Sequence, residues 1–238
     1  MSVVHRVDYV GDGLSEADLA PTPWQQALRW VEEADARAVA REDVPEPRAL
    51  SVATVDATGA PNVRTVLMRF FDERGPGFVT NRDSTKGAEL AADPRVAASL
   101  VWPAMYRAIR FRGVVELVSE EEVADYWASR PWGSRISAWA SQQSQPVSGR
   151  GPLEEAVERY ASQFPDHGRP DDVPVPDFWG GYRVRCSEVE FWAGRRNRLH
   201  DRLVFLAVGS GGGAAAQDVD LRPSLDDAAA WTVLRRQP

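Results

Sequence analysis

The sequence predicts a mainly β protein with flanking helices, an α+β fold built around an antiparallel sheet. From residue 49 onward, apolar and polar residues alternate in short runs separated by turn-forming residues, which is the pattern of β-strands. Helical periodicity is confined to separate segments, two of which begin with a capping box. Because strands joined by short turns pair antiparallel, we expect an antiparallel sheet.

Length and composition limit the functions to consider. With 238 residues and 43% hydrophobic content, the chain can form one domain, expected over residues 22–238, after an N-terminal arm, residues 1–21, that could be mobile. The net charge of −7 gives no global reason to bind nucleic acid. No apolar run approaches the roughly 18 residues of a membrane helix, and no signal peptide is recognisable, so we expect a cytoplasmic protein without membrane contact. One cysteine and three scattered histidines predict neither a disulfide nor a metal site.

The first half of the chain contains one long helix and the start of the sheet. The helix is predicted from Pro23 to about Arg41, with Thr22 as its N-cap and an apolar stripe that faces the core. Three strands follow, at residues 50–55, 62–71 and 77–80. The tight turns between them predict a three-stranded antiparallel meander.

The rest of the chain alternates between helices and strands. Further strands are expected at residues 95–102, 106–118, 182–192, 204–208 and 231–235. Shorter helices are expected after Ser84, after the capping box Ser119–Glu122, and from Pro152 to about Phe164. The last two strands flank a Gly/Ala tract, residues 209–216, that is typical of a lengthened surface loop.

Several polar groups are candidates for binding anions. Arg64 and Arg69 interrupt an apolar strand, and five residues apart they should face opposite sides, each serving an anion or extending to solvent. Thr80 and Lys86 flank a strand-to-helix corner, where free backbone N–H groups and a cation suit a phosphate, although such corners are common. Gln143 and Ser144 suit the polar edge of a heterocycle.

Two further groups lie later in the sequence. Tyr126, Arg130 and Ser134 recur at intervals of four and would share one side of a helix that continued through Pro131. Residues 192–202 gather charge at the end of a strand, namely Arg195, Arg196, Arg198, His200, Asp201 and Arg202 beside Trp192. Guanidinium groups next to an indole and an imidazole suit a flat anionic ligand, and the alternative is a solvated basic turn.

The order of these groups resembles the pyridoxamine 5′-phosphate oxidase family. The matching motifs are Arg64-Thr65-Val66-Leu67-Met68-Arg69, Thr80 with Lys86, Tyr126 with Arg130 and Ser134, Gln143-Ser144, Glu190-Phe191-Trp192 and Arg198-Leu199-His200-Asp201-Arg202. Ser129-Arg130-Pro131, Ala138-Trp139-Ala140-Ser141 and Phe178-Trp179-Gly180-Gly181-Tyr182-Arg183 also look like that family. The resemblance implies an FMN-binding split β-barrel with Greek-key-like connections and a homodimer that binds FMN, without covalent attachment, in clefts at the subunit interface.

The resemblance also implies a role for each matching residue. FMN would be bound by Arg64, Thr65, Val66, Leu67, Met68, Arg69, Thr80, Lys86, Gln143, Ser144, Trp192 and Arg202. The substrate would be bound by Arg69, Tyr126, Arg130, Ser134, Arg198 and His200, of which Arg198 and His200 would be catalytic. The implied reaction oxidises pyridoxamine or pyridoxine 5′-phosphate to pyridoxal 5′-phosphate by hydride transfer to FMN, with dioxygen reduced to hydrogen peroxide.

The chain departs from the family pattern at four positions. Arg69 stands where Lys is usual, Val79 replaces an aromatic residue, Thr85 replaces an Arg, and Ala108 replaces a Gln that reaches the flavin. These changes predict weaker FMN retention or an adjusted pocket. Two alternatives therefore stay open: a flavin oxidase of another reduced heterocycle, as in phenazine biosynthesis, and a protein that binds FMN or pyridoxal phosphate without turnover.

Overall fold

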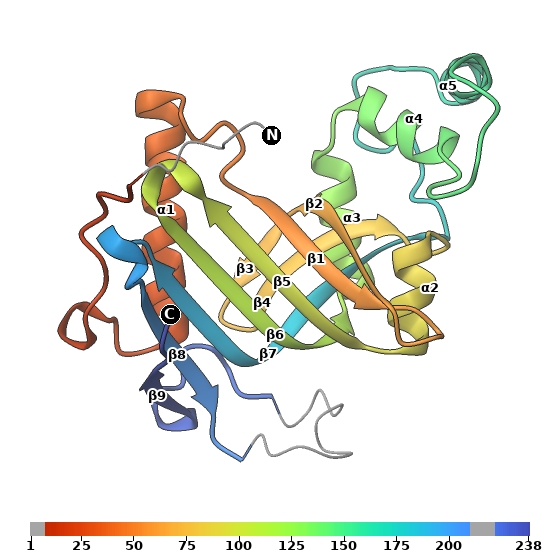
Figure 1. The fold of residues 1–238 in the computed structure, drawn as a ribbon. Coiled ribbons are helices and arrows are strands. Elements are labelled where there is room, and N and C mark those ends of the chain that lie inside the picture. The colour runs from red at the N-terminus through yellow and green to blue at the C-terminus, as the bar shows by residue number, and fades with distance from the viewer. Residues whose placement is uncertain (1–7, 210–221) are drawn as a thin grey trace, which may run out of the picture.

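The computed structural model describes residues 8–209 and 222–238, which form one curled antiparallel sheet with flanking helices (Figure 1). The Gly/Ala tract after Gly209 and the first seven residues of the predicted arm lie outside the described residues. Within the described part of the chain, no helix is both long and apolar enough to cross a membrane. The predicted α+β class and antiparallel pairing are confirmed.

The strands and helices alternate as the sequence pattern indicates. The strands are β1 (Ala49–Val55), β2 (Pro61–Leu67), β3 (Phe70–Asp72), β4 (Gly75–Asn81), β5 (Arg95–Trp102), β6 (Arg107–Leu117), β7 (Trp179–Ala193), β8 (Asp201–Ala207) and β9 (Trp231–Arg235). The helices are α1 (Pro23–Arg41), α2 (Thr85–Ala92), α3 (Glu120–Ser129), α4 (Trp132–Ala140) and α5 (Gly151–Gln163), with short helical turns η1 (Glu16–Asp18), η2 (Pro103–Met105), η3 (Arg196–Arg198) and η5 (Ala228–Ala230).

The long strand β7 organises the sheet. One edge of β7 pairs with β6 along most of its length, whereas the other edge pairs first with β4 and then with β8. The full path runs β2-β1-β5-β6-β7-β4-β3, with β8 and β9 added beside the second half of β7. The two halves of β7 therefore lie in different surroundings, one near β4 and one near β8.

The two ends of this path, β2 and β3, are separated in sequence only by Met68 and Arg69. The Met68 N–H donates to the carbonyl of Arg48, which continues the β1–β2 ladder, while the Arg69 N–H donates to the carbonyl of Gly77, which continues the β3–β4 ladder. The chain thus changes partner between consecutive residues, and the sheet must curl into a split barrel. The prediction of one strand over residues 62–71 in a three-stranded meander is wrong, because β2 and β4 are not paired.

The helices cover separate parts of the sheet. Helix α1 packs Trp30 edge-on against Phe191 of β7, in the main hydrophobic core. Helices α3, α4 and α5 lie on the other side of the molecule and share a smaller core around Trp127, Ile136 and Val173 (Figure 1). A helix does not continue through Pro131, because proline disfavours helical geometry in the residue before it, and Arg130 is extended.

The described part of the N-terminal arm packs against the end of the sheet. Leu14 is buried and its N–H donates to the Asp201 carboxylate at 2.9 Å. Glu16 in η1 forms an ion pair with Arg235 of β9. Tyr9 lies against His200, with ring centroids 5.3 Å apart.

We expect Met68→Ala to lower the free energy of unfolding by about 2–5 kcal/mol, because the Met68 side chain is only 1% exposed and fills the core at the point where the chain changes ladder. The matched control is Val101→Ala on β5, where the side chain is 55% exposed and the cost should stay within about 0.5 kcal/mol. Chemical denaturation measures both. Equal destabilisation by the two variants would contradict this account of the junction.

Candidate active site

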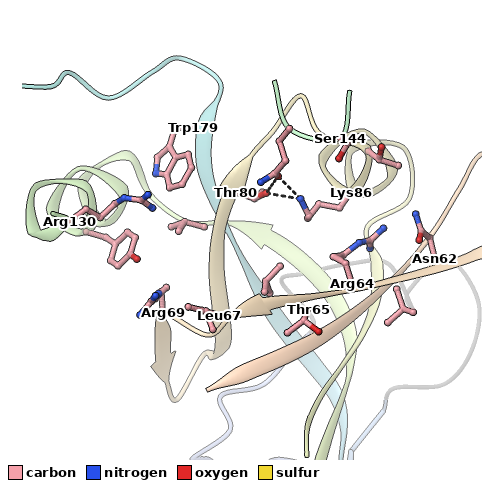
Figure 2. Close-up of a pocket in the computed structure, with 16 residues that line it drawn as sticks. Asn62, Arg64, Thr65, Leu67, Arg69, Thr80, Lys86, Arg130, Ser144 and Trp179 are labelled. Atoms are coloured by element: carbon pink, nitrogen blue, oxygen red, sulfur yellow. Dashed lines mark hydrogen bonds between the residues drawn. The ribbon is translucent and has the colours of Figure 1, made fainter. Parts of the chain in front are cut away.

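A cavity of about 520 Å³ opens where the sheet is split between β2 and β4 (Figure 2). Many of the predicted binding residues line it: Arg64, Thr65, Val66, Leu67, Arg69, Thr80, Lys86, Tyr126, Arg130, Gln143 and Ser144. Asn62, Val63, Val79, Thr85 and Trp179 complete the lining. Its size is that of an ordinary small-molecule site. The Met68 side chain points into the core instead, so only its backbone is available at this junction.

One side of the cavity holds a buried lysine. The Lys86 Nζ donates to Thr80 Oγ1 at 3.0 Å, to Ser84 Oγ at 3.1 Å and to Gln143 Oε1. All three acceptors are neutral, so no direct ion pair cancels the charge. Burial, with a smaller contribution from Arg64, lowers the pKa of Lys86 to about 8. Lys86 also lies in the first turn of α2, where the helix dipole favours anions.

Arg64 extends from β2 beside this lysine. Its guanidinium donates to Thr54 Oγ1 and forms an ion pair with the buried Glu89 at 2.8 Å. Burial pushes the pKa of Glu89 upward, but hydrogen bonds from Asn62, Thr54 and Arg64 outweigh it and hold the pKa below its ordinary value. Sequence reasoning missed Glu89. The sequence does place a charged residue, Glu89, on the buried side of α2. That position alone does not indicate that its partner is Arg64.

The opposite side of the cavity holds a second cationic group (Figure 2). The Arg69 Cζ lies 5.9 Å from the centre of the Tyr126 ring, and the Arg130 Cζ lies 4.5 Å from that of Trp179. Among the described residues, neither guanidinium forms an ion pair with a carboxylate. Burial lowers the pKa of Arg130.

Ser134 lies close to this group but not in the same cavity. The Arg130 guanidinium donates to the Ser134 carbonyl at 2.7 Å, which brings the two residues together across the break at Pro131. Ser134 lines an adjoining cavity of about 450 Å³ that shares Arg130, Gln143 and Trp179 with the first. Tyr126, Arg130 and Ser134 are therefore neighbours, although not through one continuous helix.

The remaining predicted site residues lie at the far end of β7. Trp179, the first residue of β7, lines the cavity, whereas Trp192 follows thirteen residues later, roughly 40 Å along the strand. Trp192 is in register with Ala108 of β6 and Arg202 of β8. Arg202 forms an ion pair with the buried Glu190 at 2.7 Å. A single chain therefore does not bring Trp192, Arg198, His200 and Arg202 to the cavity.

His200 and Arg198 are presented by a strained turn. Asn197 and Arg198 both have positive φ, 57° and 63°, which is costly for residues other than glycine. The His200 Nδ1 accepts the Arg195 N–H at 3.0 Å, so the neutral ring carries its proton on Nε2. Burial and the charge of Arg198 lower the pKa of His200, which favours this neutral form.

Arg195 and Arg196 belong to the same turn, for which the alternative was a solvated basic segment, and they differ in their surroundings. Arg195 is not simply solvated. Its guanidinium forms an ion pair with Asp201, whose pKa is lowered because this pair and the Leu14 N–H outweigh the effect of burial. Arg196 is exposed, in agreement with a solvated position. Within the described residues, no group of three His, Cys, Asp or Glu side chains could hold a metal ion.

Two family models match the chain. One, described as pyridoxamine 5′-phosphate oxidase, matches residues 36–164, more than half of the chain, and the other, described as the pyridoxine 5′-phosphate oxidase C-terminal dimerisation region, matches residues 179–238. The chain belongs to the pyridoxamine 5′-phosphate oxidase family. The resemblance drawn from the motifs is thereby confirmed.

Curated relatives match this chain over most of its length. A pyridoxine/pyridoxamine 5′-phosphate oxidase from Kineococcus radiotolerans is 45% identical over 98% of this chain and 97% of its own length. The enzyme of the same name from Cupriavidus taiwanensis is 46% identical over 87% of this chain and 93% of its own length.

Solved structures support the same fold. PhzG from Burkholderia lata, in complex with tetrahydrophenazine-1-carboxylic acid, has a TM-score of 0.78 and 27% identity, covering 96% of this chain and 99% of its own. A pyridoxamine 5′-phosphate oxidase-related, FMN binding protein from Nostoc punctiforme has a TM-score of 0.64 and 17% identity, covering 92% and 100%, which supports the split-barrel fold alone.

We expect FMN to bind more weakly as the pH rises through about 8, the pKa of Lys86. Below that pH the ammonium is charged and can bind a phosphate dianion, and above it the neutral amine cannot, so affinity should fall by up to about tenfold per pH unit. Fluorescence titration of the apoprotein with FMN between pH 7 and pH 9 measures the effect.

The matched control is Lys86→Arg, which stays charged over this range and should give a nearly flat profile. A wild-type profile as flat as that of Lys86→Arg would contradict a phosphate-binding role for Lys86.

Proposed function

We propose that the chain is an FMN-dependent oxidase that converts pyridoxamine or pyridoxine 5′-phosphate to pyridoxal 5′-phosphate. The observation that carries the proposal is one cavity with two separate cationic groups, Arg64 with Lys86 on one side and Arg69 with Arg130 on the other. Two groups suit two phosphate-bearing ligands, a cofactor and a substrate. The net charge of −7 means that the overall composition does not account for cations gathered there.

The first group fits the phosphate of FMN. Lys86 keeps its charge without a carboxylate partner, and the N-terminus of α2 adds backbone donors. Arg64 is held by Glu89 and Thr54 with its guanidinium at the cavity wall. Backbone and side chains of Thr65, Val66 and Leu67 would lie along the flavin, and Gln143 and Ser144 would bind its polar edge.

The second group fits the phosphate of the substrate. Arg69 and Arg130 have no carboxylate partner among the described residues, and Tyr126 supplies a phenol between them. Ser134 would join them from the adjoining cavity. Arg69 in place of the usual Lys keeps the charge but offers a planar fork of donors.

A homodimer would complete each site. Trp192 and Arg202 would contact FMN, and Arg198 and His200 the substrate, from the partner subunit. Trp192 lies at the far end of β7 and the other three follow it in η3, β8 and the turn between them, so none of the four lines the cavity of its own chain. The C-terminal residues 179–238, which match a dimerisation region, contain all four. A two-fold axis would form two such sites from the same two surfaces.

FMN, when bound, would supply the acceptor for a hydride from the substrate, whose hydroxyl or amino group loses a proton, and dioxygen would take up the electrons and protons as hydrogen peroxide. With the amine as substrate, water would then hydrolyse the imine to the aldehyde and release ammonia. The protein's contribution is to hold the substrate in position and to exclude competing reactions. Arg198, presented by its strained turn, would orient the substrate for hydride transfer. His200, neutral with its proton on Nε2, could donate a hydrogen bond to a ring substituent.

Oxidation of a reduced phenazine precursor is a second candidate, favoured by the likeness to PhzG. The ligand named in that complex is a carboxylic acid without a phosphate. The pair Arg69 and Arg130 makes this candidate the weaker one, since a substrate without phosphate has little need of both cations.

The visible spectrum of the protein, reconstituted with FMN, tests the proposal. Anaerobic addition of pyridoxine 5′-phosphate should bleach the flavin band, and admission of air should restore it with formation of hydrogen peroxide. A protein that binds both ligands without turnover would show no bleaching. Faster bleaching by a tetrahydrophenazine carboxylate than by pyridoxine 5′-phosphate would favour the second candidate.

A further inference from the structure

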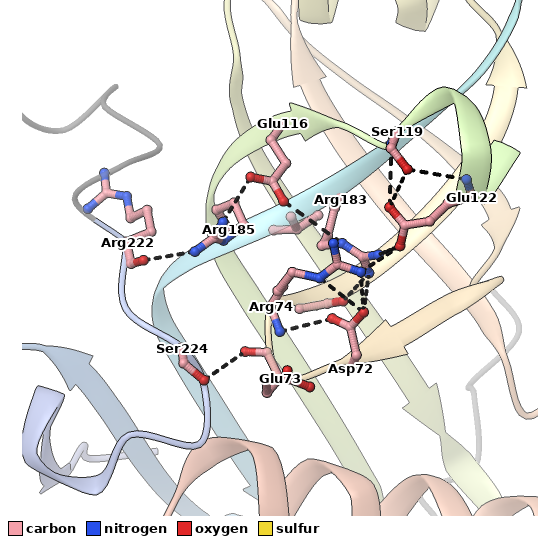
Figure 3. A network of polar contacts seen from close by, with 12 residues as sticks. Asp72, Glu73, Arg74, Glu116, Ser119, Glu122, Arg183, Arg185, Arg222 and Ser224 are labelled. Atoms are coloured by element: carbon pink, nitrogen blue, oxygen red, sulfur yellow. Dashed lines mark hydrogen bonds and ion pairs between the residues drawn. The ribbon is translucent and has the colours of Figure 1, made fainter.

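A half-buried network of ion pairs surrounds Arg183 of β7 (Figure 3). It consists of Asp72, Arg74, Glu116, Glu122, Arg183 and Arg185, called here the Arg183 network. Its three arginines balance its three carboxylates, and none of the six lines the cavity. The network therefore adds no net charge to the site, and any effect on the site must come through position.

Arg183 is the centre of the network and is only 1% exposed. Its guanidinium lies 3.2 Å from the carboxylate of Asp72 in β3, 2.8 Å from that of Glu122 in α3 and 3.9 Å from that of Glu116 in β6. Arg183 itself belongs to β7. One side chain thus ties together four elements. Despite burial, hydrogen bonds from Arg74 and Ser119 and the charges of Arg183 and Arg74 lower the pKa of Glu122 to about 2, so the pairs are ionic at neutral pH.

Two of these elements hold residues of the substrate site in place: Tyr126 lies in α3, and Arg69 directly precedes β3. Arg69 stands three residues before Asp72, and Tyr126 stands one helical turn after Glu122. A cation–π contact and a contact between two rings make a second connection: the Arg183 Cζ lies 5.6 Å from the centre of the Phe70 ring, which is 5.9 Å from that of Tyr126. Arg183 therefore helps to set the separation between Arg69 and the α3 residues, together with Arg74, which also pairs with Asp72 and Glu122.

We propose that Arg183 is a positioning residue for the substrate phosphate, which rests on the proposed function. Its planar guanidinium reaches three carboxylates at once, and a lysine ammonium has no such fork. Loss of the fork would let the β3–β4 hairpin and α3 move apart while the FMN side of the cavity, on β2 and α2, keeps its own contacts.

Arg183→Lys tests this with Arg185→Lys as its matched control. Arg185 belongs to the same face of β7 and the same network, but among the described residues its guanidinium pairs with one carboxylate, that of Glu116, and donates to the carbonyl of Arg222. Binding of pyridoxal 5′-phosphate, with unphosphorylated pyridoxal for comparison, and of FMN is measured by equilibrium titration of each variant. These measurements need no turnover, so they remain decisive if the wild-type protein fails to oxidise pyridoxine 5′-phosphate.

Arg183→Lys should weaken pyridoxal 5′-phosphate binding by about tenfold to a hundredfold, leave pyridoxal and FMN binding nearly unchanged, and raise KM for pyridoxine 5′-phosphate more than it lowers kcat. Arg185→Lys should leave all of these near wild type. The proposal would be overturned if Arg183→Lys bound pyridoxal 5′-phosphate as tightly as the wild type does. It would also be overturned if both variants lost FMN and pyridoxal 5′-phosphate binding to the same extent.

If Arg183→Lys does not fold, Phe70→Leu decides the question, because it keeps the ion pairs and removes the ring between Arg183 and Tyr126. Selective weakening of pyridoxal 5′-phosphate binding would support the positioning role. An affinity equal to that of the wild type would refute it.

Discussion

The change of hydrogen-bonding partner between Met68 and Arg69 is the constraint on which the rest of the structure depends. These two residues join the edge strands β2 and β3, so the sheet must curl until its ends meet. The sheet remains unpaired between β2 and β4, and the opening becomes the cavity. Residues close in sequence, Arg64 and Arg69, consequently reach opposite sides of one site.

The cations near the predicted site residues are of two kinds, those paired with a buried carboxylate and those without a carboxylate partner. Glu89 holds Arg64, Glu190 holds Arg202 and Asp201 holds Arg195, so these guanidinium groups are fixed in direction and partly neutralised. Lys86 has only neutral hydrogen-bond partners, and Arg69 and Arg130 have no carboxylate partner within residues 8–209 and 222–238. The second kind retains its full charge for an anionic ligand, and each proposed phosphate lies beside at least one cation of this kind.

The parts of the structure that depend on local chemistry could be predicted from the sequence. Thr22 and Ser119 cap helices as expected, since a cap needs only the next three residues. Non-local pairing could not be predicted in this way. Alternation over residues 62–71 does not reveal that the strand changes partner at Met68, and a spacing of four does not reveal that Pro131 ends the helix.

The candidate site shows the same division. The residues before Gln145 that were predicted to bind ligands mostly meet at one cavity, although spacing alone did not connect them. Glu89 and Arg183 were missed because their partners lie 25 or more residues away in sequence. The sequence did not show that Trp179 and Trp192 lie near opposite ends of one long strand, β7. Because of this distance, the proposed site needs a second subunit.

The most direct test of the central claim, that each site is shared between two subunits, is complementation between two inactive variants. Arg69→Met removes a cation from the cavity, and Arg198→Met removes the residue expected from the partner. After the two are unfolded together, mixed and refolded with FMN, about half of the dimers should be mixed, and each mixed dimer should contain one intact site. Oxidation of pyridoxine 5′-phosphate should recover to about a quarter of the wild-type rate. No recovery, despite mixed dimers detected by mass spectrometry, would contradict a shared site.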